Sequence, residues 1–333
     1  MTDQSPLAEA QLKYAEAIPS ASMASETVTL IDALGRTLAQ DFNAPEDSPP
    51  YNRAIVEGFL VNTAETQSAS EENPISVQVI GHVNPGDESC PSFGEGQAIE
   101  VNTGSILPDG QVSIVRMWEA KRDGDTVTVS RPFPPRFFIE EQGCDITKDS
   151  TLLKAGHVLT PADLANIASL GVNEISVACA PKVAIFASGD EVIAHTDTLR
   201  SGSIRDCNSI QLAAAVTETG GIAEQKGIMG DDFDAFVKAV KASLKTADMI
   251  IIAGGTAVGG RDFVSDLIKE VGELVIDGVA MRSGRPLIMG VTNGKPIIAV
   301  AGHPPEALRG FRLFGATALA KLLGRDIDPA IEG

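Results

Sequence analysis

The feature of this chain that most constrains its fold is a regular alternation of two kinds of segment after Pro181. Residues 182–187 and 248–253 are short, mostly apolar runs, which are typical of strands buried on both faces. Residues 208–219 and 233–244 carry apolar side chains at intervals of three and four, which predicts amphipathic helices. Because strands and helices alternate, we expect an open, largely parallel sheet with helices on both faces.

Further elements complete this half of the chain. Apolar runs on either side of Asn293 and Gly294 predict a hairpin, because this dipeptide favours the two-residue turn between antiparallel strands. Helices are also expected at 263–271 and 305–323, and the hairpin strands at 287–291 and 296–300. The half as a whole is therefore expected to form a three-layer α/β/α domain.

The first half of the chain has a different pattern, with proline-rich breaks at 45–50 and 132–135. Between the breaks, alternating residues at 75–80 predict a strand, and 112–129 predicts a hairpin that turns near Gly124. This stretch is therefore expected to be rich in β-structure.

Two helices are predicted outside the β-rich stretch. Apolar spacing over 25–38 predicts an amphipathic helix near the start of the chain. A second helix is expected to begin at Pro161, with Thr160 as its N-cap, and to end at Gly171.

Composition excludes several classes of protein. A formal net charge of -19 argues against nucleic acid or an anionic membrane as the partner, since both require a basic surface. The four cysteines are widely spaced without a C-x-x-C pair, so free thiols are expected rather than a zinc site. The N-terminus lacks the pattern of a signal peptide, and the apolar runs are too short to cross a bilayer. We therefore expect a soluble cytoplasmic protein.

A glycine-rich loop after the apolar strand at 248–253 gives the strongest functional signal. It contains Gly254, Gly255, Thr256, Gly259 and Gly260, followed by Arg261, Asp262 and the start of a helix. Glycines let the backbone approach a ligand closely, and a helix start offers N–H groups to an anion. The loop matches neither the P-loop nor the dinucleotide fingerprint, and a tight turn without a ligand is the alternative.

Three other segments carry side chains suited to an anionic ligand and its metal. The first segment follows a predicted strand and contains Ser188, Gly189, Asp190 and Glu191. The second is basic and contains Arg282, Gly284 and Arg285. The third lies at the start of a helix and contains Arg205, Asn208 and Ser209. Paired carboxylates can hold Mg²⁺, and a guanidinium binds phosphate through a planar fork. Each segment also has a simpler interpretation, which is a solvated turn for the first, surface arginines for the second and a helix N-cap for the third. Because parallel strands end at one edge of a sheet, we expect these segments to converge there.

These segments, together with Gly302, His303 and Pro304, recur in the order seen in the MoeA/gephyrin E-domain family of molybdopterin molybdenumtransferases. The first half is similar to that family as well. Its resembling segments are 33–39, 49–59, 102–104, 107–110 and 143–146. The resemblance therefore covers nearly the whole chain.

The resemblance implies a multidomain α/β and α+β architecture. It gives an elongated, discontinuous first domain at 1–45 plus 146–178 and an inserted β-rich domain at 46–145. It also gives a molybdopterin-binding domain at 179–325 and a tail at 326–333. Members are typically homodimers whose site lies between two subunits, so a second copy of the chain is an expected partner. The partners could also include the upstream adenylylating protein or a recipient molybdoenzyme.

The implied reaction hydrolyses adenylylated molybdopterin and inserts molybdate into the dithiolene with Mg²⁺ or a similar cation. Glu57, Asp145, Glu191 and Asp262 are the expected catalytic residues, and Asp231 or Asp232 is a further acidic position. Asp190, Glu191 and Asp262 are the expected metal ligands. The expected cofactor contacts are Thr103, Ser188, Gly189, Asp190, Arg205, Asn208, Ser209, Gly254, Gly255, Thr256, Gly259, Arg282, Gly284, Arg285, His303 and Pro304.

Departures from the family pattern leave two hypotheses. Glu57 stands where the family has aspartate, and His303 and Glu306 stand in a segment that reads Pro-Gly-Asn-Pro-Val-Ser in the family. The chain ends at Gly333, where the family usually continues into a fourth domain. The first hypothesis is a molybdenum or tungsten insertase. The second is a carrier that binds molybdopterin, as precursor or mature cofactor, without performing insertion.

Overall fold

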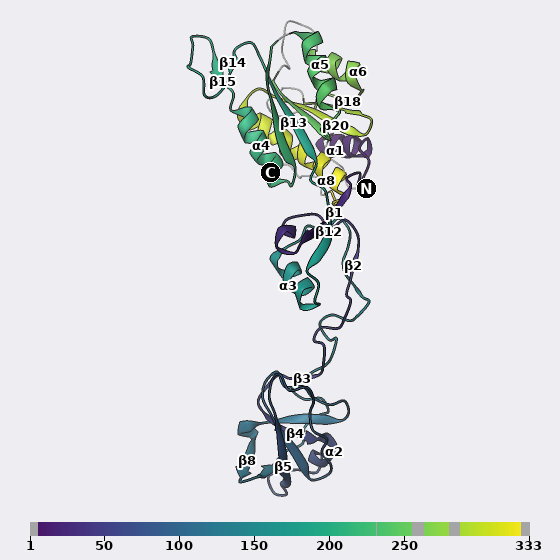
Figure 1. Ribbon diagram of the computed structural model, residues 1–333, viewed down its shortest axis with the longest axis vertical. Coiled ribbons are helices and arrows are strands. Elements are labelled where there is room, and N and C mark those ends of the chain that lie inside the picture. Colours follow the sequence, from purple (N-terminus) through teal and green to yellow (C-terminus); the bar gives the residue numbers. More distant parts are fainter. Residues whose placement is uncertain (1–5, 231, 255–262, 280–286, 328–333) are drawn as a thin grey trace. The chain divides into compact units, whose positions relative to one another are not determined.

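The computed structural model describes residues 6–230, 232–254, 263–279 and 287–327. The chain forms two compact units (Figure 1). Unit 1 comprises Met1–Asp41, Lys154–Ala165 and Asn173–Gly333, and unit 2 comprises Phe42–Leu153 and Asn166–Val172. The finer division into three domains and a tail stays a prediction. Among the described residues, no helix is long and apolar enough to span a membrane.

A six-stranded sheet forms the centre of unit 1, in the order β16-β13-β17-β20-β19-β18. Its strands are β13 (Lys182–Ser188), β16 (Ile222–Met229), β17 (Met249–Ala253), β18 (Glu273–Asp277), β19 (Ile288–Thr292) and β20 (Lys295–Val300). The first four in spatial order are parallel, and β19 and β18 continue the sheet antiparallel. The largely parallel sheet is thus confirmed, with an antiparallel edge added by the hairpin at Asn293 and Gly294.

Helices cover both faces of this sheet, as the three-layer prediction requires (Figure 1). They are α1 (Pro6–Glu16), α4 (Asn208–Glu218), α5 (Phe233–Ser243), α6 (Phe263–Val271), α7 (Pro304–Gly310) and α8 (Ala316–Leu323). Tyr14 of α1 and Leu212 of α4 pack with Ile251 on one face. Phe236 of α5 packs on the other face with Ile252, the next residue along β17. Because successive strand residues point to opposite faces, the buried strands feed two separate cores.

The helix expected over 25–38 is wrong. Instead, β1 (Ser25–Thr29) pairs antiparallel with β12 (Glu174–Ala178), and a single 3-10 turn, η1 (Ile31–Ala33), follows. Val28 lies opposite Ile175. The β-branched residues of 27–29 suit a strand, and a partner about 150 positions away decides the outcome, which local spacing does not reveal.

The last helix is interrupted, whereas the sequence predicts a continuous one. A π-helical segment, η3 (Phe311–Gly315), separates α7 from α8. A Cβ atom at Gly315 would lie 2.4 Å from the Phe311 ring, so the ring occupies space that a side chain would need. Gln11 Nε2 and Thr317 Oγ1 both donate to Leu313 O, at 2.7 and 2.9 Å, which satisfies the carbonyl inside this segment.

Unit 2 contains a second six-stranded sheet, in the order β7-β4-β6-β5-β9-β8. Its elements are β4 (Gly58–Asn62), α2 (Thr63–Thr66), β5 (Ile75–Val83), β6 (Gln97–Val101), β7 (Val112–Arg116), η2 (Met117–Glu119), β8 (Ala120–Asp123) and β9 (Thr126–Val129). The turn at Gly124 is confirmed, since β8 and β9 pair antiparallel around it. The hairpin over 112–129 is wrong in extent, because η2 diverts the chain and β7 pairs with β4 instead.

Short pairs of strands complete the fold. They are β2 (Phe42–Asn43) with β11 (Thr151–Leu153), β3 (Arg53–Ala54) with β10 (Ile139–Glu140), and β14 (Val192–Ile193) with β15 (Ile204–Arg205). Helix α3 (Pro161–Ser169) begins as predicted, where the Asp163 N–H donates to Thr160 Oγ1 at 3.3 Å. The cysteines, all within the described ranges, are free.

Candidate functional site

The strand order of unit 1 creates a place where ligands bind in open α/β sheets. From β13 the chain passes through α4 to β16 on one side, and then through α5 to β17 on the other side of β13. The connections therefore diverge between β13 and β17. A crevice forms outside the carboxyl ends of strands at such a switch point. This carboxyl edge, comprising the residues that follow β13, β17 and β20, is the candidate site.

Close backbone packing holds the three strand ends together. Gly254, at φ +97, donates its N–H to Val300 O at 3.0 Å. A Cβ atom there would lie 2.6 Å from Ser188 O, and one on Gly302 would lie 3.7 Å from Gly254 Cα. Only glycine satisfies both the positive φ and the contact at position 254. Gly254, the first residue after β17, is therefore packed between the ends of β13 and β20 and forms part of the floor of the carboxyl edge.

Side chains of α4 join this floor to the start of α7. Asn208 Nδ2 donates to Gly302 O at 2.8 Å, and Gln211 Nε2 donates to Pro304 O at 2.8 Å. The buried Ser209 donates its N–H to Asp206 Oδ1 at 3.0 Å, which starts the helix. The structure thus brings Ser188, Asn208, Ser209, Gly254 and Pro304 to one edge, as expected. Their roles as ligand contacts stay predictions.

Two exposed carboxylates follow β13 at the same edge. Gly189, at φ +140, donates its N–H to Met229 O at 3.2 Å. A Cβ atom on Gly189 would lie 2.7 Å from Glu191 Oε2, and one on Gly230 would lie 2.9 Å from Asp190 Oδ1. The glycines therefore leave the space in which the carboxylates lie, and their oxygen atoms suit a hard cation such as Mg²⁺. Within the described ranges, no third metal-binding side chain completes this pair.

Several expected site residues lie outside the described ranges. They are Asp231, Gly255, Thr256, Gly259, Asp262, Arg282, Gly284 and Arg285. Asp232 is described and caps α5, because its Oδ1 accepts the Ala235 N–H at 3.0 Å. Arg205 donates from Nε and Nη2 to Asp197 O, at 3.3 and 3.2 Å, in the segment between β13 and α4.

The start of α7 is poor in donors for an oxyanion. His303 is the N-cap, and its carbonyl accepts the N–H groups of Glu306 and Ala307 at 3.1 and 2.9 Å. Pro304 and Pro305 carry no N–H. Glu306 Oε2 is buried, and it has no hydrogen-bond partner within the described ranges. This helix start therefore offers an incoming oxyanion a carboxyl group and few N–H donors.

Three expected residues belong to unit 2. Glu57 is exposed just before β4, and its carbonyl accepts the Met117 N–H at 3.2 Å. Thr103 is exposed in the turn after β6, where the next residue, Gly104, donates its N–H to Ala54 O at 2.7 Å. Asp145 follows the end of β10 and is also exposed.

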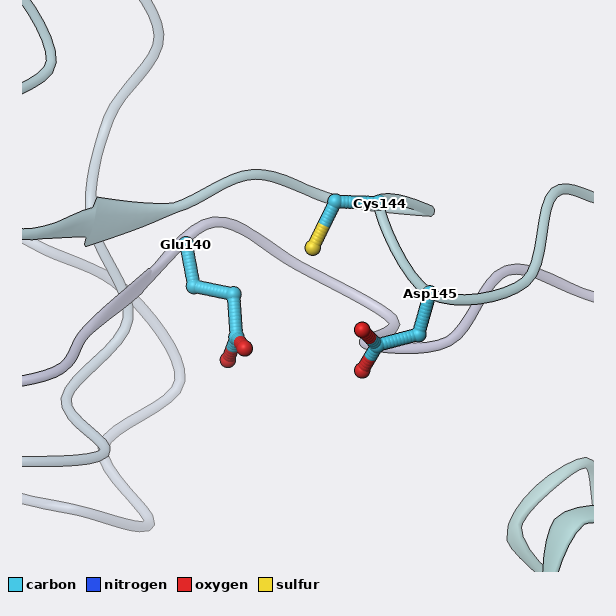
Figure 2. A group of neighbouring side chains, drawn as sticks. All are labelled: Glu140, Cys144 and Asp145. Carbon is cyan, nitrogen blue, oxygen red and sulfur yellow. The ribbon is translucent and has the colours of Figure 1, made fainter.

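Asp145 belongs to a group that the sequence does not reveal. Figure 2 shows its carboxylate near the carboxylate of Glu140 and the thiol of Cys144. One ligand atom of each residue lies within 4.8 Å of those of the other two. Arg53 forms an ion pair with Glu140, and this contact raises the pKa of Arg53 against the opposing effect of burial, with a smaller contribution from Asp145. A cation here would compete with Arg53 for Glu140. The three members of the group come from one short segment, residues 140–145, and the pairing of β3 with β10 brings Arg53 beside it.

The carboxyl edge and the group around Asp145 fall within regions that match known family models. Residues 5–171 match the MoeA N-terminal region (domain I and II), and 184–321 match the probable molybdopterin binding domain.

Individual relatives cover most of the chain. The molybdopterin molybdenumtransferase of Staphylococcus aureus (strain MSSA476) is 31% identical over 304 residues, which span 91% of this chain and 73% of that protein. The solved structure of the molybdopterin biosynthesis moeA protein from Pyrococcus horikoshii OT3 has a TM-score of 0.84 and 30% identity, covering 96% of this chain and 80% of that one. A molybdenum cofactor biosynthesis protein from Pyrococcus furiosus, at 21% identity and a TM-score of 0.55, shares the fold. This chain therefore belongs to the MoeA family.

Proposed function

We propose that this chain binds adenylylated molybdopterin and inserts molybdate into its dithiolene with release of AMP. The observation that carries the proposal is the convergence of Ser188, Gly254 and Asn208 at the switch point between β13 and β17. Such a crevice suits an elongated ligand with phosphate groups. The match of 184–321 to a molybdopterin binding domain and the names of the curated relatives support the same ligand.

Hydrolysis of the adenylylated pterin needs a positive charge near phosphates in an acidic protein. We assign Asp190 and Glu191, with Asp262, to hold Mg²⁺, which when bound would neutralise charge on the phosphates. A water oxygen would bond to one phosphorus of the diphosphate bridge, and the bond between that phosphorus and the bridging oxygen would break. The bridging oxygen would leave on the other phosphate, a carboxylate would take a proton from the water, and the products would be AMP and molybdopterin. Glu57 and Asp145 are proposed as further reacting carboxylates, because both stand at acidic positions of segments that resemble the family.

Backbone and polar groups of the carboxyl edge would orient the pterin. In this proposal, Asn208, Ser209, His303 and Pro304 contact the ligand around the starts of α4 and α7. Thr103 of unit 2 contributes a hydroxyl group, and Arg205 contributes a guanidinium beyond β15. Arg282 and Arg285, from the segment outside the described ranges, would bind its phosphates.

A carrier without insertion activity is the second candidate. It is favoured by the start of α7, where Glu306 has a buried carboxylate oxygen and two prolines remove N–H donors. A carboxylate repels an incoming molybdate, and repulsion is strongest where water is excluded. The carrier would bind the pterin but release no AMP. For either function we propose a homodimer in the cytoplasm.

Release of AMP and retention of metal separate the two candidates. The purified chain is incubated with adenylylated molybdopterin, Mg²⁺ and molybdate, and AMP and pterin-bound molybdenum are measured. We expect stoichiometric AMP from the parent chain and a loss of at least 100-fold in the Glu191→Gln variant, with pterin binding nearly unchanged. Glu218→Gln, an exposed position at the end of α4, is the matched control and should behave as the parent. Tight pterin binding by the parent chain without AMP would refute the insertase in favour of the carrier.

A further inference from the structure

The single tryptophan of the chain is exposed in unit 2. Trp118 lies in η2, directly after β7, and 70% of its surface is accessible to solvent. The indole is the largest apolar side chain, and tryptophan is usually buried to a high degree in folded proteins. The exposure of Trp118 therefore needs an explanation, whereas that of a single surface leucine or isoleucine would not.

A charged side chain lies over this indole and is part of a group of ion pairs. The Arg116 guanidinium lies over the indole, with Cζ 5.0 Å from the ring centroid, and it also lies 4.8 Å from the Phe138 ring. Arg116 Nε donates to Glu119 Oε2 at 2.8 Å, and Glu119 also pairs with Arg131. These contacts lower the pKa of Glu119 to about 2, with the Arg116 hydrogen bond as the main cause. A guanidinium that is itself held by an ion pair thus backs one face of the ring, which favours a defined orientation of the indole before a ligand binds.

The backbone next to the tryptophan is joined to a residue that is proposed to react. Arg116 of β7 pairs with Gly58 of β4, and the Met117 N–H donates to the carbonyl of Glu57 at 3.2 Å. A Cβ atom on Gly58 would lie 2.1 Å from Val115 O, so the two strands are packed closely at this point. The backbone of η2 is therefore fixed directly to the residue that carries the Glu57 carboxylate.

We propose that Trp118, backed by Arg116, stacks against the fused nitrogen heterocycle of the ligand next to Glu57. This inference rests on the proposed function, which supplies two such rings, the pterin and the adenine of the adenylyl group. Arg116 occupies one face of the indole, and the large exposed fraction leaves room for a planar ring elsewhere. Stacking on an aromatic side chain tolerates either heterocycle, because each presents a π-face.

Tryptophan fluorescence can report on binding at this position, because Trp118 is the single tryptophan of the chain. The full chain is titrated with AMP and, separately, with molybdopterin, while fluorescence and calorimetry are recorded. For the ring that stacks, we expect quenching that saturates together with the heat signal. Trp118→Ala should weaken binding of the ligand that carries the stacked ring by about 5- to 150-fold, and Trp118→Phe should weaken it by much less. Ile80→Ala, which truncates another exposed apolar side chain of unit 2, is the matched control and should bind as the parent.

The outcomes separate the two claims. Quenching and weakened binding with AMP alone identify adenine as the stacked ring, and the same result with molybdopterin alone identifies the pterin. If molybdopterin and AMP bind Trp118→Ala with the affinity of the parent chain and leave the parent fluorescence unchanged, the stacking role is overturned and the proposed function stands. If calorimetry detects neither ligand on the parent chain, both are overturned.

Discussion

Replacing Gly254 with alanine tests whether close packing of strand ends builds the carboxyl edge. Gly254 has φ +97, and an added Cβ atom would lie 2.6 Å from Ser188 O. Gly227 in β16 is a matched control, since it has φ +93 and an added Cβ atom there would meet no described heavy atom within 4 Å. Both substitutions carry the same conformational penalty, and only one adds the collision.

The expected magnitudes follow from these two contributions. A non-glycine residue in the left-handed region costs about 1–2 kcal/mol, which applies to both variants. A collision with a backbone atom cannot be relieved by a rotamer change, and overpacking of this kind costs a further ~1–3 kcal/mol. We therefore expect Gly254→Ala to lower the free energy of unfolding by about 2–5 kcal/mol, and Gly227→Ala by about 1–2 kcal/mol.

Urea denaturation of the full chain, followed by circular dichroism, measures both values, and calorimetric titration with molybdopterin measures binding. Gly254→Ala should also lose pterin affinity at a temperature where it is still folded, whereas Gly227→Ala should keep it. Equal destabilisation of the two variants, or unchanged pterin affinity in Gly254→Ala, would refute the assignment of the strand ends as the floor of the site.

Three further predictions concern Asn208, Glu306 and Glu119. Asn208→Ala removes the hydrogen bond to Gly302 O, so it should cost about 0.5–1.5 kcal/mol in urea denaturation and weaken pterin binding; an unaltered pterin affinity would exclude Asn208 from the site. Glu306→Ser removes the carboxyl group at the start of α7, so molybdate retention on the pterin should rise by about tenfold, and unchanged retention would mean that Glu306 has no effect on oxyanion binding. Glu119→Gln should destabilise the chain by about 1–3 kcal/mol at pH 7, and this difference should shrink as the pH falls from about 4.5 towards 2, because a depressed carboxyl pKa stabilises the fold only above that window. Denaturation curves of both proteins at several pH values measure it, and a difference independent of pH would mean that Glu119 acts by packing alone.

Much of unit 1 could be predicted from local pattern. The run of isoleucines at 250–252 is buried on both faces, and the spacing of Phe236, Val237 and Val240 places one side of α5 against the sheet. Each of these elements can be recognised from its own residues. A strand buried on both faces must be continuously apolar, and a helix buried on one side must have apolar residues at helical spacing.

Elements that depend on distant partners could not be predicted in this way. The strand β1 forms because β12 lies alongside it, and the edge strand β18, which the sequence did not indicate, forms by pairing with β19. The site shows the same division. The residues after β13 and β17 followed from the strand pattern, whereas Arg53 meets Glu140, and the backbone before Trp118 meets that of Glu57, only through strand pairing in unit 2.

Hydrogen exchange followed by mass spectrometry, with and without molybdopterin, tests most directly whether the carboxyl edge of the unit 1 sheet binds the pterin. We expect slower exchange in peptides that cover 188–192, 206–209 and 302–306. Exchange should be unchanged at the hairpin turn over 292–295, which joins β19 to β20 away from the switch point. Binding that leaves those three segments unprotected, or protects the hairpin turn instead, would contradict it.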